Sequence, residues 1–416
     1  MKAHGAILVT AICGLIAGIA DATADDPRSD PDAYYQLSTA WQGFCGSLDI
    51  VNDGRNNTPI LAPTGLFSGQ HWKLTPGGNG FYHLSTEWQG ESKRLDIVND
   101  GRNDEPVLAP AGDFSGQHWK IEPAARPGYF NLSTMWQGPQ KRLDIVNDGS
   151  NDKPRLAAAG NFSGQNWLFT RVAHVGPVPA SLGAYPFYKK YIDAGGIPVI
   201  SSEKVSDAAL YRARYLILQM LAGQDTVREA MVRNGARVAI IAATEETTAI
   251  PENEILQNHG EFVDWNERAR GLGGTMQYPL GSGAEENILC LAGDGYRGED
   301  ILMHEFAHSM HHLGLAPTYP DFETKLNAAF ENAKSNGFWD DAGPNGTDGN
   351  TYARKNEIEY FAEGVQSWFN VNQPVPDASH NTVDTRAELQ SYDPQLYALI
   401  AEYFPADVRA CSCHAH

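Results

Sequence analysis

Basic residues are scarce in this chain: 31 lysines and arginines stand against 51 aspartates and glutamates, a formal net charge of −20. This deficit argues against nucleic acid or an anionic membrane surface as the main partner. Long apolar runs are missing after residue 20, so we expect no membrane span later in the chain. Cysteine is rare as well, with five among 416 residues. This length nevertheless allows two or three domains.

The first residues have the pattern of an export signal. Lys2 supplies positive charge, residues 6–20 are apolar, and Ala22-Thr23-Ala24 is a small-x-small cleavage site. An apolar run of this length is too short to span a bilayer comfortably. We therefore expect residues 1–24 to be a signal peptide that is cleaved near Ala24, which leaves a secreted, extracellular protein.

Cleavage would remove Cys13 and leave four cysteines, for which disulfides are the default in an oxidising compartment. Three pairings of the four are possible. We expect Cys290 to pair with Cys411 or Cys413, which would tie the C-terminal tail to the second domain. The alternative is a metal site in the tail, which ends in Cys-Ser-Cys-His-Ala-His.

Residues 34–173 repeat themselves three times. The units begin at Tyr35, Tyr82 and Phe130, with periods of 47 and 48 residues. Each unit carries Trp-Gln-Gly, then Leu-Asp-Ile-Val-Asn-Asp-Gly, then Phe-Ser-Gly-Gln-x-Trp. Units of this size bury their apolar faces only together, and the short apolar runs between turn signals predict strands. We therefore expect a closed, three-fold, all-β domain at residues 31–173.

These repeats resemble the ricin-B-type lectins, a β-trefoil family defined by three Gln-x-Trp motifs. The motifs here are Gln70-His71-Trp72, Gln117-His118-Trp119 and Gln165-Asn166-Trp167. The resemblance implies carbohydrate binding to glycans or polysaccharide. It also implies that one aspartate per repeat accepts hydrogen bonds from sugar hydroxyls, namely Asp49, Asp96 and Asp144.

This chain departs from the family at the usual aromatic platform for the sugar, which is alanine in each repeat (Ala62, Ala109 and Ala157). The residue before each motif glutamine is glycine. Two roles remain for the tryptophans of Trp-Gln-Gly: they supply the missing sugar platform, or they belong to the core (Trp41, Trp88 and Trp136). We interpret Gln-x-Trp mainly as core packing and Asn-Asp-Gly as a turn that needs positive φ.

A proline- and glycine-rich stretch at residues 174–184 predicts a linker. The second domain, residues 185–410, has the mixed pattern of an α+β fold. Helices are predicted at residues 205–222, 225–233, 300–313, 321–336, 355–370 and 386–403, and strands at 238–242 and 287–291.

The motif His304-Glu305-Phe306-Ala307-His308 is the strongest chemical signal in the chain. Residues four apart share one face of a helix, so the two histidines can bind one zinc ion. Glu305 lies beside that face and can take a proton from zinc-activated water. Gly314 and Pro317 are interpreted as the end of this helix. Of the next histidines, we expect His311 to pack or to support a ligand, and His312 to lie on the surface.

Catalytic zinc normally has three protein ligands, so a further carboxylate is needed. The apolar helix at residues 356–369 offers Glu359 as the preferred ligand. Glu363 lies one turn later, which suits a carboxylate that bonds a ligand histidine. Glu363 and Asp348 remain the alternatives for the third ligand.

The run at residues 352–363 resembles the catalytic domain of the anthrax lethal factor and Pro-Pro endopeptidase family. That family has H-E-x-x-H and, downstream, a tyrosine seven residues before a ligand glutamate. The resemblance implies a zincin-like metallopeptidase domain with His304, His308 and Glu359 as ligands. It further implies Glu305 as the base and Tyr352 as hydrogen-bond donor to the oxyanion.

We therefore expect a secreted zinc-dependent endopeptidase that acts on proteins or peptides and is held near glycans by its lectin-like trefoil. One alternative is a glycan-binding protein whose second domain is catalytically silent and only stabilised by zinc. Another is a protease whose trefoil binds protein instead of sugar.

Overall fold

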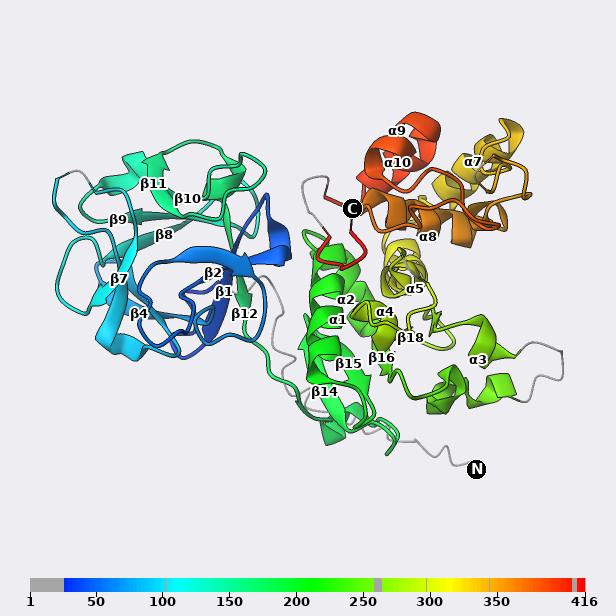
Figure 1. The fold of residues 1–416 in the computed structure, drawn as a ribbon, viewed down its shortest axis with the longest axis horizontal. Helices are drawn as coiled ribbons and strands as arrows, with labels where there is room; N and C mark the ends of the chain where they lie inside the picture. Colours follow the sequence, from blue (N-terminus) through cyan, green and yellow to red (C-terminus); the bar gives the residue numbers. More distant parts are fainter. Residues whose placement is uncertain are drawn as a thin grey trace, which may run out of the picture.

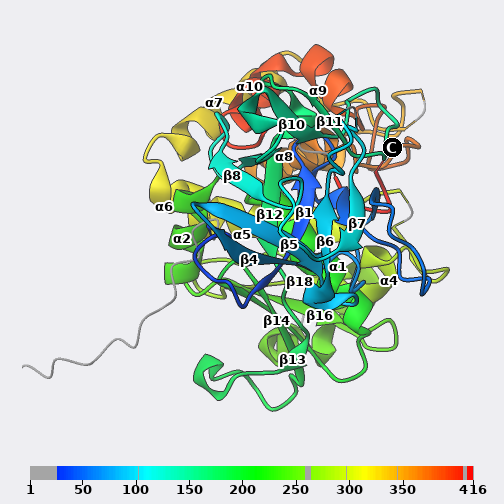
Figure 2. The same cartoon turned by 90° about the vertical axis from the view of Figure 1, so that its left-hand side faces the viewer.

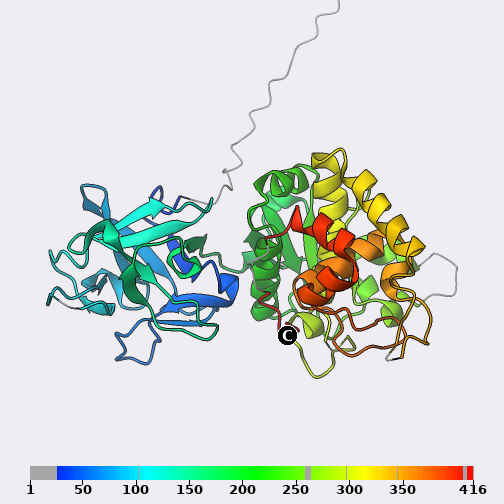
Figure 3. The same cartoon turned by 90° about the horizontal axis from the view of Figure 1, so that it is seen from above.

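The computed structural model describes residues 26–101, 103–257, 264–296, 298–343, 345–405 and 410–415. The predicted signal peptide, residues 1–24, lies outside them. Two lobes lie side by side, the first β-rich and the second mixed (Figure 1). They remain distinct when seen from above (Figure 3), and Figure 2 looks onto the first lobe with the second behind it. In the part of the chain that is described, no helix has both the length and the apolar character needed to cross a membrane.

The first lobe has four strands in each repeat, in line with the predicted three-fold, all-β domain. The first repeat forms β1 (Tyr34–Thr39), β2 (Gly46–Asp49), β3 (Ile60–Pro63) and β4 (Trp72–Gly78). The second forms β5 (Phe81–Thr86), β6 (Lys93–Asp96), β7 (Val107–Pro110) and β8 (Trp119–Pro123). The third forms β9 (Phe130–Thr134), β10 (Lys141–Asp144), β11 (Arg155–Ala158) and β12 (Trp167–Arg171). Six strands close a barrel in the order β1-β12-β9-β8-β5-β4, and the others pair as three hairpins. This is the architecture of a β-trefoil.

The Gln-x-Trp motifs form the core of the trefoil. Their tryptophans are fully buried, and each indole donates a hydrogen bond to the carbonyl of the leucine 24 residues earlier, at 2.7–2.9 Å. Each motif glutamine donates to the aspartate of the same repeat, for example Gln70 Nε2 to Asp49 Oδ2 at 3.2 Å. Buried polar groups that are satisfied in this way stabilise the fold. The interpretation of these motifs as core packing is therefore confirmed.

The tryptophans of Trp-Gln-Gly connect neighbouring repeats. Trp88 Nε1 in the second repeat donates to Ile50 O in the first, and Trp136 Nε1 in the third donates to Ile97 O in the second, each at 3.1 Å. Trp41 Nε1 closes the ring by donating to Ile145 O at 2.9 Å. The glycines of Asn-Asp-Gly have φ between +82° and +89°, so the predicted turn is confirmed at this motif.

A six-stranded sheet lies in the second lobe, in the order β13-β14-β15-β16-β18-β17. Its strands are β13 (Gly176–Pro177), β14 (Lys190–Ala194), β15 (Ile197–Ser201), β16 (Arg237–Ile241), β17 (Gly271–Leu272) and β18 (Leu280–Ala284). Strands β15, β16 and β18 are parallel to one another, and the remaining pairs are antiparallel. Because β13 lies inside the predicted linker, part of that stretch already belongs to the second lobe.

The helices of the second lobe follow the predicted order. The longer ones are α1 (Asp207–Met220), α2 (Asp225–Arg233), α5 (Ile301–Met310), α7 (Phe322–Ser335), α8 (Glu357–Trp368), α9 (Arg386–Tyr392) and α10 (Pro394–Ala401). Short helices form at α3 (Trp265–Arg268), α4 (Glu285–Ile288) and α6 (Ala316–Thr318). The predicted strand at 287–291 is wrong, because α4 occupies its start. The predicted helix at 386–403 is two helices, since Asp393 caps a new one at Pro394.

Gly314 does not end the motif helix, which is a second correction. Helix α5 continues through a widened π-type turn at His311–Leu315 into α6. A Cβ atom on Gly314 would lie 2.6 Å from Val227 and 2.9 Å from Met231 of α2. Glycine is needed here because α2 packs directly against this backbone, and not because the helix stops.

Helix α1 faces the trefoil. The Tyr215 hydroxyl donates a hydrogen bond to Gln36 of β1, and Arg214 donates to Arg171 O of β12 at 2.9 Å. Phe44 of the first repeat is 7% exposed and belongs to the apolar core of the second lobe. The first repeat, together with β12 of the third, thus provides the face of the trefoil that packs on the second lobe.

Two disulfides fix the C-terminal tail. Cys290 pairs with Cys413, one of the two predicted partners. The other predicted pairing, Cys290 with Cys411, is wrong, because Cys411 pairs with Cys45 of the trefoil across 366 residues. Docking of the first repeat on the second lobe brings Cys45 to the tail. Both tail cysteines are therefore oxidised, so the tail offers no thiolate pair to a metal.

Candidate metal centre

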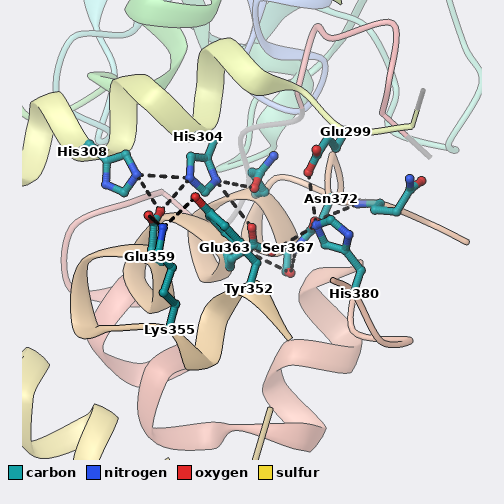
Figure 4. A network of polar contacts seen from close by, with 12 residues as sticks. Glu299, His304, His308, Tyr352, Lys355, Glu359, Glu363, Ser367, Asn372 and His380 are labelled. Carbon is teal, nitrogen blue, oxygen red and sulfur yellow. Dashed lines mark hydrogen bonds and ion pairs between the residues drawn. The ribbon is translucent and has the colours of Figure 1, made fainter. Parts of the chain in front are cut away.

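Helices α5 and α8 bring the candidate ligands together. Asp300 caps α5 by accepting a hydrogen bond from Met303 N at 3.0 Å, and Asn356 caps α8 by accepting from Glu359 N at 2.8 Å. One helix thereby presents His304 and His308 on the face that packs against the other helix. Figure 4 shows both imidazoles pointing toward Glu359.

Three ligand atoms form a nearly equilateral triangle. His304 Nε2 lies 3.1 Å from His308 Nε2 and 3.2 Å from Glu359 Oε2, and His308 Nε2 lies 3.1 Å from that same oxygen. Tetrahedral zinc ligands at about 2.1 Å from the ion lie about 3.4 Å apart, so the residues present fit zinc. Of the three carboxylates considered for the third ligand, the structure brings Glu359 to the two histidines, and not Glu363 or Asp348.

Electrostatics in the cluster favour a positive charge. Burial alone would raise the pKa of Glu359, but hydrogen bonds from His304 and His308 outweigh it and hold that pKa well below its usual range. Burial lowers the pKa of His308 to about 4, so this imidazole is neutral at pH 7. Burial would also lower the pKa of His304, but Glu359 and the nearby Glu305 and Glu363 raise it to about 10. Positive charge is thus stabilised where the three ligand atoms meet.

Gln366 orients the first histidine, a role that sequence reasoning assigned to Glu363. His304 Nδ1 donates to Gln366 Oε1 at 2.8 Å, whereas Glu363 Oε1 lies 3.6 Å away. Gln366 is fully buried and itself donates to Asp300 O at 3.2 Å. An acceptor at Nδ1 selects the tautomer whose Nε2 lone pair faces the site. A glutamine seven residues after Glu359, on the same helix face, was the available sequence signal.

Tyr352 and Lys355 lie on the approach to the cluster. Tyr352 belongs to a short 3-10 turn at Tyr352–Arg354, and its ring centroid is 6.1 Å from that of His304. Lys355 Nζ lies 3.1 Å from the Tyr352 hydroxyl and 3.1 Å from Glu359 Oε1. Burial raises the pKa of Tyr352, so its hydroxyl keeps its proton. The sequence analysis did not identify Lys355, although its i,i+4 spacing to Glu359 is a recognisable pattern of ion pairs on a helix.

A cavity of about 550 Å³ opens over the cluster, and Glu305 and Tyr352 line it. Burial raises the pKa of the Glu305 carboxyl to about 7. The edge strand β17 and the residues after it form one wall. A Cβ atom on Gly273 would lie 2.4 Å from His308 Cβ, so this wall runs directly along α5.

The remaining histidines after the motif behave differently from each other. His311 is buried, packs edge-on against Phe322 and lies 2.8 Å from Glu323, in line with the predicted packing role. His312 was expected on the surface, but it is half-buried and lines the cavity.

The predicted sugar-binding aspartates are buried. Asp49, Asp96 and Asp144 are 4–5% exposed, their Oδ1 atoms are enclosed, and burial raises their pKa values. Each Oδ2 already accepts from a motif glutamine. Their observed role is therefore structural, and sugar recognition by these carboxylates stays a prediction that the geometry does not favour.

Instead, each repeat exposes one aromatic ring from its Phe-Ser-Gly-Gln segment. Phe67, Phe114 and Phe162 are 58%, 59% and 58% exposed. Each ring lies over a glycine two residues earlier, where a Cβ atom would come within 2.4 Å of the ring. The sequence signal for this feature was the repeated phenylalanine itself.

Comparisons with known proteins concern the trefoil. No family model and no curated protein matches the chain. Among solved structures, the designed three-fold symmetric protein ThreeFoil matches 34% of this chain and 100% of its own, with 24% identity and a TM-score of 0.30. The Macrolepiota procera ricin B-like lectin, solved with lactose, matches 34% and 98%, with 18% identity and a TM-score of 0.29. SeviL, bound to asialo-GM1 saccharide, matches 34% and 98%, with 15% identity and a TM-score of 0.26.

Proposed function

We propose that this protein is a secreted zinc-dependent endopeptidase with a glycan-binding trefoil. The observation that carries the enzymatic part is the meeting of His304, His308 and Glu359 within 3.2 Å of one another, beneath a cavity that Glu305 lines. The two disulfides support export, because such bonds persist in oxidising compartments.

His304, His308 and Glu359 would hold the zinc ion. When bound there, zinc acts as a Lewis acid toward a peptide carbonyl and makes water more acidic. Glu305 accepts a proton from the attacking water and passes it to the leaving amine. A carboxylate whose pKa lies near 7 can do both at neutral pH.

The Tyr352 hydroxyl donates a hydrogen bond to the oxygen on which negative charge develops. Lys355 Nζ donates to the phenol oxygen, so the lysine does not compete for the hydroxyl proton of Tyr352. An extended peptide would add to the edge strand β17, whose outer side lies along the cavity.

Glycan binding rests on a separate feature of the trefoil. The exposed rings of Phe67, Phe114 and Phe162 offer flat apolar surfaces of the kind that stack on sugar rings. Loss of glycan-array binding in a Phe67→Ala, Phe114→Ala, Phe162→Ala variant tests this part. Unchanged array binding by a folded triple variant would refute it.

The enzymatic part is tested with Glu305→Gln and a peptide library. The variant should keep wild-type zinc content and lose at least about 100-fold in cleavage rate, the usual contribution of a general base. Glu357→Gln is the matched control, because Glu357 lies on α8 but outside the ligand cluster. Undiminished cleavage by Glu305→Gln would exclude the mechanism. Glycan binding with no cleavage by the wild type would favour a catalytically silent second domain.

A further inference from the structure

A second group of ligand-type side chains lies behind the first. Glu299 precedes α5, Glu363 lies in α8, and His380 follows in the loop after α8. His380 Nε2 is 3.4 Å from Glu299 Oε2 and 3.8 Å from Glu363 Oε2 (Figure 4). All three side chains line the same cavity as the first cluster.

Burial makes this arrangement costly unless positive charge is present. Glu299 and Glu363 are 7% and 3% exposed, and they converge on one imidazole. His304 Nδ1 also lies 3.6 Å from Glu363 Oε1, but His304 carries no charge once it serves as a neutral zinc ligand in the first cluster. Two buried carboxylates whose one remaining cationic partner is His380 then have an uncompensated negative charge. A divalent cation would neutralise both carboxylates and bind the imidazole as a neutral ligand.

The surrounding hydrogen bonds resemble those behind metal ligands. His380 Nδ1 lies 2.9 Å from Asp377 Oδ1, which leaves Nε2 facing the carboxylates. Glu363 Oε2 accepts from Asn372 Nδ2 at 3.1 Å. A carboxylate that holds the far nitrogen of a histidine is a recurrent partner of metal-bound imidazole. The His380 ring is therefore oriented for its Nε2 to act as a ligand.

We propose that Glu299, Glu363 and His380 form a second divalent-cation site, separate from the first. One imidazole and two carboxylates suit a borderline cation such as Zn²⁺ or Mn²⁺, whereas Ca²⁺ takes six to eight oxygens. His304 lies between the sites, with Nε2 toward Glu359 and Nδ1 toward Glu363. The two sites thus face opposite edges of one ring and share no ligand atom.

The second cation would also fix the tyrosine of the first site, a consequence that rests on the proposed function. Tyr352 N donates to Ser379 O at 2.7 Å, one residue before His380. A cation that holds His380 against α8 therefore holds the backbone that positions Tyr352. His380 acts here as a positioning residue, and its loss should reduce the maximal cleavage rate with little change in zinc affinity at the first site.

Metal stoichiometry of the full-length protein tests the proposal. After equilibration with excess Zn²⁺ and removal of free ion, native mass spectrometry should find two ions per chain. His380→Ala, and the more conservative Glu299→Gln, should each retain one ion, as should the double variant His304→Ala/His308→Ala. Circular dichroism checks that each variant is folded, and Glu357→Gln should retain two.

The alternative to a cation in the second group is a proton on His380. Burial alone would lower the pKa of His380, but the hydrogen bond to Glu299 and the charges of Glu363 and Glu299 raise it to about 10. A single ion in the wild type, lost with His304 and His308, would overturn the second site and leave the proposed function intact. A single ion that is lost only in His380→Ala would overturn the first site and support the second.

Discussion

Gln366 offers the sharpest test of the metal centre, because sequence reasoning did not identify it. Replacing it by leucine removes the acceptor that lies 2.8 Å from His304 Nδ1 in a fully buried position. The ring then loses the contact that selects its tautomer and orientation. Removal of such a partner costs about 10- to 100-fold in metal affinity, which is about 1.4 to 2.8 kcal/mol.

The assay is a zinc competition titration against a chromophoric chelator at pH 7. Gln366→Leu should bind zinc about 10- to 100-fold more weakly at the first site. Gln366→Glu keeps an acceptor and should stay close to the wild type or bind more tightly. The titration is simplest to interpret in a His380→Ala background, where only the first cluster is expected to bind zinc.

Ser367→Ala is the control for general loss of stability. Ser367 neighbours Gln366 and is also fully buried, and its hydroxyl donates to Glu363 O or Val383 O. Its loss should lower the unfolding midpoint without changing zinc affinity. A folded Gln366→Leu protein whose zinc affinity stays within about twofold of the wild type would refute the orienting role.

Three further predictions concern other parts of the molecule. Cys45→Ser/Cys411→Ser should free the lobes, so that calorimetry resolves two transitions; one unchanged transition would contradict this. Burial, with Arg94 and His118, lowers the pKa of His83 to about 4. Between pH 6.5 and 4 the unfolded chain therefore takes up a proton that the folded chain does not, and stability falls as the pH falls. His83→Asn introduces the residue that the third repeat has at this position. Urea titrations of this variant should show a smaller loss of stability between pH 6.5 and 4 than those of the wild type, and an equal loss would contradict the role of His83. Gly273→Ala should weaken zinc binding, because its Cβ would lie 2.4 Å from His308 Cβ, whereas Gly293→Ala meets nothing within 4 Å and should have no effect; equal affinities would refute the close approach.

Local patterns predicted much of the architecture. The repeats predicted the trefoil because three copies of one strand pattern can bury their apolar faces only against each other. The spacing of His304 and His308 predicted a shared helix face, since residues four apart lie above one another. Glu359 was predicted from an acidic position on an apolar helix. Each of these depends on contacts within one element or on a repeated pattern.

Other features depended on contacts that no local pattern encodes. Gly314 looked like a helix end, yet the packing of α2 against it requires glycine inside the helix. Residues 287–291 had the apolar run of a strand, but α4 and a turn form there, directly after β18, which already has β16 and β17 as neighbours on its two sides. The aspartates of the trefoil resembled sugar ligands, but the motif glutamines bind them in the interior.

The sequence by itself determined the trefoil, the order of the helices and the two imidazoles of the candidate metal cluster, because periodicity along the chain decides which side chains share a face. Only the tertiary structure decided the partner of Cys411, the choice of Gln366 over Glu363 beside His304, and the convergence of Glu299 with His380. These pairs are separated by tens to hundreds of residues, and their distances depend on how helices and lobes pack. Packing of this kind is a property of the whole fold and not of any one segment.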